Sequence, residues 1–171
     1  MDNCIEIVGK NYYGSYKYTR YACRGIVIQG ENILLSYATK KDFWMLPGGG
    51  KEENETDLEC AIREVLEETG YVVTSGKPVV EVVEYYEDTR YVSQYFICKI
   101  TGESETQLTQ EEKATGLERR WIPLKEAMLI FSKHEQYRNS YEEKRGAYLR
   151  EYSALLKMLE NKEIKDLNNL S

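Results

Sequence analysis

The sequence has few of the features that would mark several common classes of protein. Its single histidine, His134, excludes a metal site built from several imidazoles. It has no apolar segment at the N-terminus and no run of eighteen apolar residues, so we predict neither a secretory signal nor a membrane span. Basic residues are outnumbered, with 23 Lys and Arg against 29 Asp and Glu and a net charge of −6. Nucleic-acid binding relies on basic surfaces, so we expect no nucleic-acid partner. Because we predict neither a secretory signal nor a membrane span, we also expect a cytoplasmic protein without a membrane partner.

The cysteines also lack any pattern. None of them forms a CxxC pair. Cys23 and Cys98 lie in apolar, strand-like runs, and Cys60 lies in a segment with helical periodicity. We expect all four thiols, Cys4 included, to be reduced, and most of them to serve as small apolar side chains. The length of 171 residues predicts a single domain spanning residues 1–171.

The most informative stretch runs from Leu46 to Tyr71, where a glycine-rich turn and a polar loop precede a predicted helix. Thr56 is a good N-cap and Glu59 follows three residues later, which is the pattern of a capping box. Gly70 stands where a left-handed residue usually ends a helix. Apolar residues recur at helical spacing, which predicts a buried face: Leu58, Ala61, Ile62, Val65 and Leu66.

The opposite face of this helix carries three acids, Glu64, Glu67 and Glu68, three and four residues apart. Like charges at that spacing cost about 0.2–0.5 kcal/mol per pair. They also lie near the C-terminal end, where the helix dipole favours cations. A solvated acidic surface is the ordinary explanation. Breaking two local rules beside a glycine turn instead favours a functional site, and carboxylates suit a hard cation such as Mg²⁺ or Mn²⁺.

The stretch resembles the box of the Nudix hydrolase family. Its pattern is a glycine, five residues, a glutamate, seven residues, and then R-E-hydrophobic-x-E-E-x-G-hydrophobic. Every fixed position is matched, and only the last one departs from the commoner aliphatic residue: Gly49, Glu55, Arg63, Glu64, Val65, Glu67, Glu68, Gly70 and Tyr71. So many fixed positions make the match specific, although it covers only residues 49–71.

The resemblance implies an α+β fold, a three-layer α/β/α sandwich around a mixed β-sheet. It also implies divalent-metal-dependent hydrolysis of the pyrophosphate bond of a nucleoside diphosphate derivative, with Mg²⁺ or Mn²⁺ as cofactor. Candidate substrates are nucleoside triphosphates, nucleotide sugars and dinucleoside polyphosphates. The metal ligands would be Glu64, Glu67 and Glu68, with a backbone carbonyl of Gly48 or Gly49.

Other roles follow from the same resemblance. Arg63 cannot be a metal ligand, so we expect it to pair with Glu55 and hold the loop against the helix, orienting the ligands. The general base is Glu67 or Glu68, or an acid of the distant 102–116 loop. In that loop Glu112 is the candidate, with Glu111 as an alternative, and an ordinary solvated charge run explains the pair about as well.

Four residues outside the box are candidates for substrate contact. Arg20 and Arg24 share one face of a predicted strand and could contact phosphate, although an exposed polar face is the simpler explanation. Phe43 and Trp44 precede the glycine turn and could stack on a base, which contributes about 1–3 kcal/mol per base in nucleic-acid binders. Trp44 is equally compatible with a place in the core.

The remaining chain predicts further strands and one long helix. Strands are expected at 4–8, 18–29, 33–37, 79–86 and 91–100, and a strand leading into a helix at 117–127. The 102–116 segment is polar and turn-rich, which predicts a mobile loop. A stripe from Tyr141 to Leu159 predicts a C-terminal helix at about 141–160, which packs on the core or forms a homodimer.

Two other functions stay open. The chain could be a non-catalytic nucleotide sensor, although such domains usually lack box acids and none is missing here. It could instead act on RNA 5′ ends, although only Arg119-Arg120 and Lys144-Arg145 form basic pairs.

Overall fold

The computed structural model describes residues 3–168, with side chains up to Lys162. Its strands are β1 Cys4–Val8, β2 Tyr18–Ile26, β3 Ile28–Gln29, β4 Asn32–Ala38, β5 Phe43–Met45, β6 Gly48–Gly50, β7 Tyr71–Ser75, β8 Val80–Tyr86, β9 Thr89–Glu103 and β10 Leu117–Pro123. Its helices are α1 Asp57–Thr69, α2 Gln110–Ala114, α3 Leu124–Ser132, the 3₁₀ helix η1 His134–Tyr137, and α4 Glu142–Asn168. None of the helices in this described part combines the length and apolar character needed to cross a membrane.

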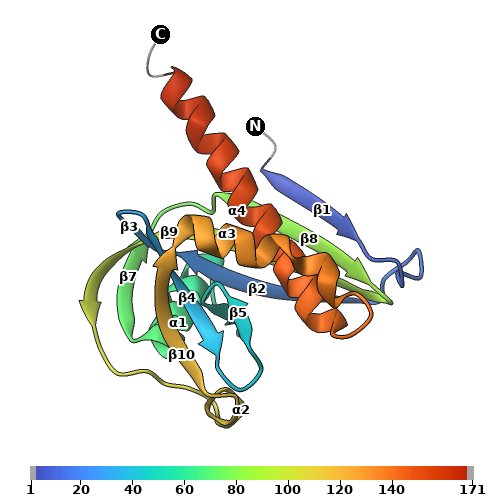
Figure 1. The fold of residues 1–171 in the computed structure, drawn as a ribbon, viewed down its shortest axis with the longest axis horizontal. Coiled ribbons are helices and arrows are strands. Elements are labelled where there is room, and N and C mark those ends of the chain that lie inside the picture. The colour runs from blue at the N-terminus through green and yellow to red at the C-terminus, as the bar shows by residue number, and fades with distance from the viewer. Residues whose placement is uncertain (1–2, 169–171) are drawn as a thin grey trace.

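The strands form two sheets. The larger has the order β1-β8-β9-β2-β6, with β7 also paired to β9, and the smaller has the order β10-β4-β3, with β5 paired to β4. The larger sheet is mixed, because β1–β8 and β2–β9 are parallel while the remaining pairs are antiparallel. Helices cover the sheets from both sides (Figure 1), which confirms the predicted α+β fold.

Alternation along β9 places neighbouring side chains in two different cores. Tyr95 lies in the core that includes Tyr148 and Leu155 of α4, and Phe96 lies in the core that includes Val65 of α1. All three aromatic side chains are buried. Successive strand residues point to opposite faces, so one strand can anchor helices on both sides of the sheet.

Helix α1 forms as its cap residues predict. Thr56 and Glu59 make both bonds of the capping box, since the Glu59 N–H donates to Thr56 Oγ1 at 3.1 Å and the Thr56 N–H donates to Glu59 Oε2 at 2.8 Å. Gly70 has φ of 77° and donates its N–H to the Leu66 carbonyl at 2.8 Å. This left-handed conformation needs glycine and fixes the end of the helix.

The segment predicted as a mobile loop at 102–116 is more regular than expected. Strand β9 continues to Glu103, and the Ser104 N–H donates to the Gly70 carbonyl at 2.7 Å. A one-turn helix, α2, follows with its own capping box between Thr109 and Glu112. The Ser104 bond, together with one from the Gln107 N–H to the Glu67 carbonyl at 2.8 Å, holds the start of the segment against the C-terminal end of α1.

The C-terminal helix was predicted at about 141–160 and extends from Glu142 to Asn168. It packs on β8, β5, α3 and η1, and its far end projects beyond the sheets (Figure 1). Cys23, Cys60 and Cys98 are buried and form no disulfide.

Candidate active site

The site begins where the glycine turn meets α1. Strand β6 pairs with β2, so that Gly48 lies opposite Arg24 and Gly49 lies opposite Cys23. A Cβ atom added to Gly49 would lie 2.6 Å from the Glu64 carboxylate, whereas one added to Gly50 would meet no atom within 4 Å. Glycine at position 49 therefore lets the turn approach Glu64 closely.

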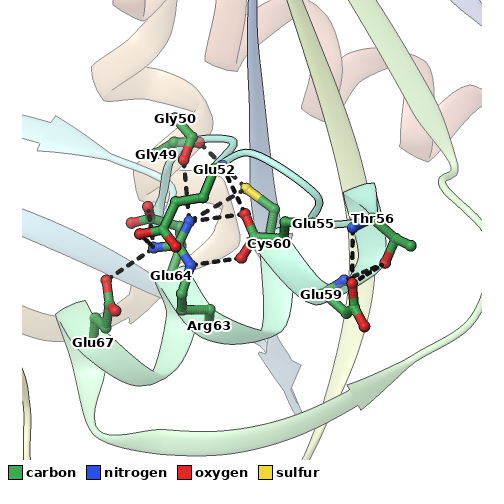
Figure 2. A network of polar contacts seen from close by, with 10 residues as sticks. All are labelled: Gly49, Gly50, Glu52, Glu55, Thr56, Glu59, Cys60, Arg63, Glu64 and Glu67. Atoms are coloured by element: carbon green, nitrogen blue, oxygen red, sulfur yellow. Dashed lines mark hydrogen bonds and ion pairs between the residues drawn. The ribbon is translucent and has the colours of Figure 1, made fainter.

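Arg63 joins the turn, the loop and the acidic helix face (Figure 2). Its Nε and Nη2 donate to the two oxygens of Glu55, at 2.6 and 3.1 Å. Its Nη1 donates to Glu64 Oε1 at 2.8 Å and to Glu67 Oε2 at 3.0 Å, and Nη2 also donates to the Gly50 carbonyl at 3.1 Å. One planar guanidinium thus fixes three carboxylates and the turn, a task for which its five donors are suited.

The charge of Arg63 affects its partners unequally. Its hydrogen bonds lower the pKa of Glu55 to about 2, which keeps that carboxylate ionised. Burial raises the pKa of Glu64, and the contacts with Arg63 oppose this rise. Only 11% of the Glu64 side chain is exposed, compared with 29% for Glu67. Glu67 is therefore the more accessible of these two helix acids.

Glu68 makes its hydrogen bonds with β4 and the glycine turn. Its Oε2 accepts the Ser36 hydroxyl at 2.6 Å and the Gly48 N–H at 3.3 Å. Burial is the main cause that raises its pKa to about 8, with further contributions from the charges of Glu64 and Glu112, while the Ser36 bond and Arg24 oppose the rise. The helix acids thus occupy two different environments, one beside a cation and one largely dry.

Glu112 comes from α2, well outside the box, and its charge is close enough to raise the pKa of Glu64 and of Glu68. Its Oε2 accepts the Thr109 N–H at 2.7 Å, so this carboxylate also caps its own helix. Glu111, the alternative in the same helix, is exposed. The structure therefore brings Glu112 toward the predicted site.

The donor set fits a hard divalent cation, because carboxylate and carbonyl oxygens are the ligands that Mg²⁺ and Mn²⁺ prefer. Among the described residues, no three acidic, His or Cys side chains converge as ligands of one ion in this arrangement. Arg63 Nη1 lies between Glu64 and Glu67 and brings its positive charge into contact with both carboxylates. These two acids are thus already arranged around a cationic group.

A cleft of about 450 Å³ opens beside this site, between the larger sheet and α4. Its wall includes Arg24, Glu84, Tyr86 and Arg150. Arg24 is 8% exposed, and its Nε lies buried without a hydrogen bond. Since Arg24 pairs with Gly48 across the strands and lowers the pKa of Glu68 by its charge, it connects the cleft with the glycine turn.

The other predicted substrate contacts lie in different places. Arg20 is exposed in a separate hollow of about 470 Å³ that Lys51 also lines. Phe43 is buried, contacts Tyr148 edge to face at 5.6 Å, and also borders the cleft. Trp44 stacks on Tyr37, with ring centroids 4.0 Å apart.

Sequence reasoning missed Ser36, Glu84, Arg150 and Glu151. Glu84 and Glu151 could have been found, because each is a charged residue at a position where the periodic pattern predicts a buried side chain. Glu84 interrupts an apolar strand, and Glu151 lies one turn from Tyr148 and one turn from Leu155 on the buried stripe of α4. Nothing in its local sequence marks Ser36.

Comparison with known proteins agrees with this geometry. The NUDIX domain family matches residues 19–144. Diphosphoinositol polyphosphate phosphohydrolase 3-alpha of Mus musculus is 28% identical over 116 residues, which are 68% of this chain and 69% of that protein. The mRNA-decapping enzyme subunit 2 of Arabidopsis thaliana is 35% identical over 94 residues, which are 51% of this chain and 25% of that protein.

Solved structures share the fold. A NUDIX hydrolase from Nitrosomonas europaea superposes with a TM-score of 0.56 at 17% identity, covering 79% of this chain and 88% of that one. A UDP-X diphosphatase superposes with a TM-score of 0.53 at 20% identity, covering 65% and 54%. With the family match over most of the length and the box residues gathered around Arg63, the chain belongs to the Nudix family of hydrolases.

Proposed function

We propose that this Nudix hydrolase cleaves the pyrophosphate bond of a nucleoside diphosphate derivative, with water attacking phosphorus. The observation that carries the proposal is the set of contacts made by Arg63, which holds Glu55, Glu64 and Glu67 beside the glycine turn. A pyrophosphate is densely negative, so its hydrolysis needs groups that position it and neutralise charge.

The residues that would hold Mg²⁺ or Mn²⁺ are Glu64, Glu67 and Glu68, together with the carbonyl of Gly48. When bound, the cation supplies charge neutralisation and polarises the phosphoryl oxygens. Arg63 would keep Glu64 and Glu67 directed to the same side of α1 through its Nη1. Ser36 and the Gly48 N–H would hold Glu68 in place.

The proton of the attacking water would pass to a carboxylate, and Glu67, Glu68 and Glu112 are the candidates. The greater exposure of Glu67 supports it, because a general base must reach the water that it deprotonates. Glu112 is supported by its charge acting on both Glu64 and Glu68. Burial raises the pKa of Glu68 to about 8, so Glu68 would have to lose its own proton to a bound cation before it could accept one from water.

The cleft beside Arg24 would take the nucleoside part of the substrate. Its wall combines the buried guanidinium of Arg24 and that of Arg150, whose side chain is 14% exposed, with aromatic rings and with acids from β8 and α4. This mixture of charges suits a flat, hydrogen-bonding base. Arg20 and Trp44 remain candidates for phosphate and base contact outside the cleft.

Diphosphoinositol polyphosphates, which the mouse relative's name specifies, are a second candidate class of substrate. Glu84, Glu142 and Glu143 offset the charges of Arg24 and Arg150 in the cleft. A ring that carries many phosphates would meet these acids. The charge balance therefore favours a nucleotide over an inositol polyphosphate.

The test is product release from a substrate panel with Mg²⁺ or Mn²⁺, run with wild type, Glu67→Gln and, as a matched control, Glu160→Gln on the exposed side of α4. The panel holds nucleoside triphosphates, oxidised dGTP, ADP-ribose, nucleotide sugars, dinucleoside polyphosphates, a diphosphoinositol polyphosphate and a 5′-triphosphorylated RNA. We expect one nucleotide to be cleaved well by wild type and by the control, and not by Glu67→Gln.

Failure to release phosphate or nucleoside monophosphate from any nucleotide would refute the proposal. Nucleotide binding that persists in Glu67→Gln after cleavage is lost would count against a sensor without catalysis. Binding to the 5′-triphosphorylated RNA that falls steeply with salt would favour the RNA alternative, since phosphate contacts release counterions.

A further inference from the structure

Helix α4 makes polar contacts with the segment that leads into the glycine turn, although nearly all of the helix lies beyond residue 144, where the family match ends. The Trp44 N–H donates to Tyr148 Oη at 3.1 Å, and the Leu46 N–H donates to Glu151 Oε2 at 2.8 Å. Tyr148 and Glu151 lie one turn apart on the buried face of α4. Side chains of α4 therefore hold this segment by its backbone N–H groups.

The second oxygen of Glu151 is equally occupied. Oε1 accepts the Tyr95 hydroxyl and Arg150 Nε, both at 2.9 Å, and lies 3.6 Å from Arg24 Nε. Arg24 Nη1 in turn donates to the Leu46 carbonyl at 3.4 Å. Leu46 is thus held at its N–H by Glu151 and at its carbonyl by Arg24, and Glu151 pairs with Arg24.

A short path connects this arrangement to the proposed catalytic groups. Pro47 follows Leu46, and its carbonyl accepts the Gly25 N–H at 2.9 Å. Gly48 comes next, and its N–H donates to Glu68 at 3.3 Å. A shift at Leu46 would move the Gly48 N–H relative to Glu68, and would free the Arg24 side chain that lines the cleft.

Glu151 is also a costly residue to bury. Its side chain has no exposed surface, and a buried carboxylate needs compensation from partners. Those partners are two guanidiniums, a hydroxyl and one backbone N–H. An apolar side chain could fill the same space, so the backbone bond and the pairing with Arg24 are what the carboxylate adds.

We propose that Glu151 is a positioning residue of the active site. It touches no reacting group, and it acts by holding Leu46 and Arg24, and through them the glycine turn opposite Glu68. The catalytic part of this inference rests on the proposed function. Its structural part, that Glu151 holds the turn, can be measured without a substrate.

The test compares Glu151→Gln and Glu151→Ala in the full chain. The Gln amide oxygen can still accept the Leu46 N–H, whereas Ala removes the contact with Leu46 and the contact with Arg24. We expect amide exchange at Leu46 and Gly48, measured by NMR, to rise at least about tenfold in Glu151→Ala and to stay near wild type in Glu151→Gln. With the best nucleotide of the panel, we expect kcat to fall about 100-fold in Glu151→Ala. We expect the kcat of Glu151→Gln to be at least about tenfold higher than that of Glu151→Ala.

Leu155→Ala is the control for lost packing, because Leu155 is fully buried one turn further along the same helix. It should lower the melting temperature while leaving the kcat of the folded protein and the exchange at Gly48 unchanged. Wild-type kcat in both Glu151 variants, or a loss in Leu155→Ala equal to that in Glu151→Ala, would overturn the inference.

If Glu151→Ala does not fold, Glu151→Gln decides. The inference predicts wild-type exchange at Leu46 for this variant, and at least about a tenth of wild-type kcat. Rapid exchange at Leu46 with full activity would overturn it. If wild type cleaves nothing in the panel, the proposed function has failed, and the exchange of Leu46 and Gly48 still shows whether Glu151 holds the turn.

Discussion

Replacing Glu68 with Gln should stabilise the metal-free protein at neutral pH. The Glu68 side chain is buried between α1, Ser36 and the glycine turn, and burial raises its pKa from 4.5 to about 8. A glutamine has nearly the same shape, and its amide oxygen can accept the same two hydrogen bonds. The substitution therefore removes the free-energy cost of ionising a buried carboxyl group.

The direction of the pH effect follows from proton binding. Because the folded pKa of Glu68 lies above its unfolded pKa, the folded state holds this proton more tightly, so the contribution of Glu68 to stability is fully present below pH 4.5 and is lost as the pH rises toward 8. Each pH unit in this window contributes about 1.4 kcal/mol, so the loss by pH 7.5 is at most about 4 kcal/mol.

The amide NH₂ of the glutamine needs a partner in the same site, and an unsatisfied buried donor costs about 1–3 kcal/mol. We therefore expect a net gain of about 2 kcal/mol at pH 7.5, which corresponds to a melting temperature higher by about 4–8 °C for a chain of this size.

The assay is urea unfolding of wild type and Glu68→Gln with a chelator present, at pH values between 4.5 and 8. At pH 4.5 only the amide cost remains, so the Gln variant should be less stable than wild type by about 1–3 kcal/mol, and the difference in unfolding free energy should then rise in favour of the variant to its maximum near pH 8. Glu160→Gln, which removes an exposed charge from α4, should show no such trend. A difference that does not change with pH, or a Gln variant that is less stable at pH 7.5, would show that Glu68 is not strained in the way described.

Two further substitutions test the contacts around Arg63. Gly49→Ala adds a Cβ 2.6 Å from the Glu64 carboxylate and should lower kcat by at least about tenfold, because small misplacements of catalytic groups are costly. Gly50→Ala is the control and should leave kcat near wild type, because its Cβ meets no atom within 4 Å. Equal effects of the two substitutions on kcat would contradict the reasoning. Arg63→Lys replaces a planar fork with a single ammonium and should lower kcat about 10–100-fold. Arg138→Lys, at an exposed ion pair, is its control, and wild-type activity in Arg63→Lys would show that the bridging geometry is unimportant.

Much of the site could be predicted because it is local in sequence. The capping box, the end of α1 at Gly70 and the bond between Glu55 and Arg63 all join residues within about two helical turns or one loop. Such contacts depend on the spacing of a few side chains, so a sequence pattern can specify them. The α+β fold followed from resemblance to a family, and the order of strands and helices agreed with it.

The long helix and the loop show where prediction from local pattern was incomplete. The apolar stripe located α4 but did not show that Glu151 belongs to its buried face. The polar composition of 102–116 indicated a loop, while the structure contains the capped helix α2 within it. Thr109 and Glu112 carried the same capping signal as Thr56 and Glu59, without an apolar run behind it.

The sequence by itself therefore determined where α1 begins and ends, and the resemblance to the family added that Arg63 pairs with Glu55. Only the tertiary structure decided that Arg24 is buried while Arg20 is exposed, that Ser36 holds Glu68, and that Leu46 is bound by a carboxylate 105 residues away. The reason is that these outcomes depend on how α4 and β4 pack against the turn, and burial by distant segments leaves no periodic pattern in the residues that become buried.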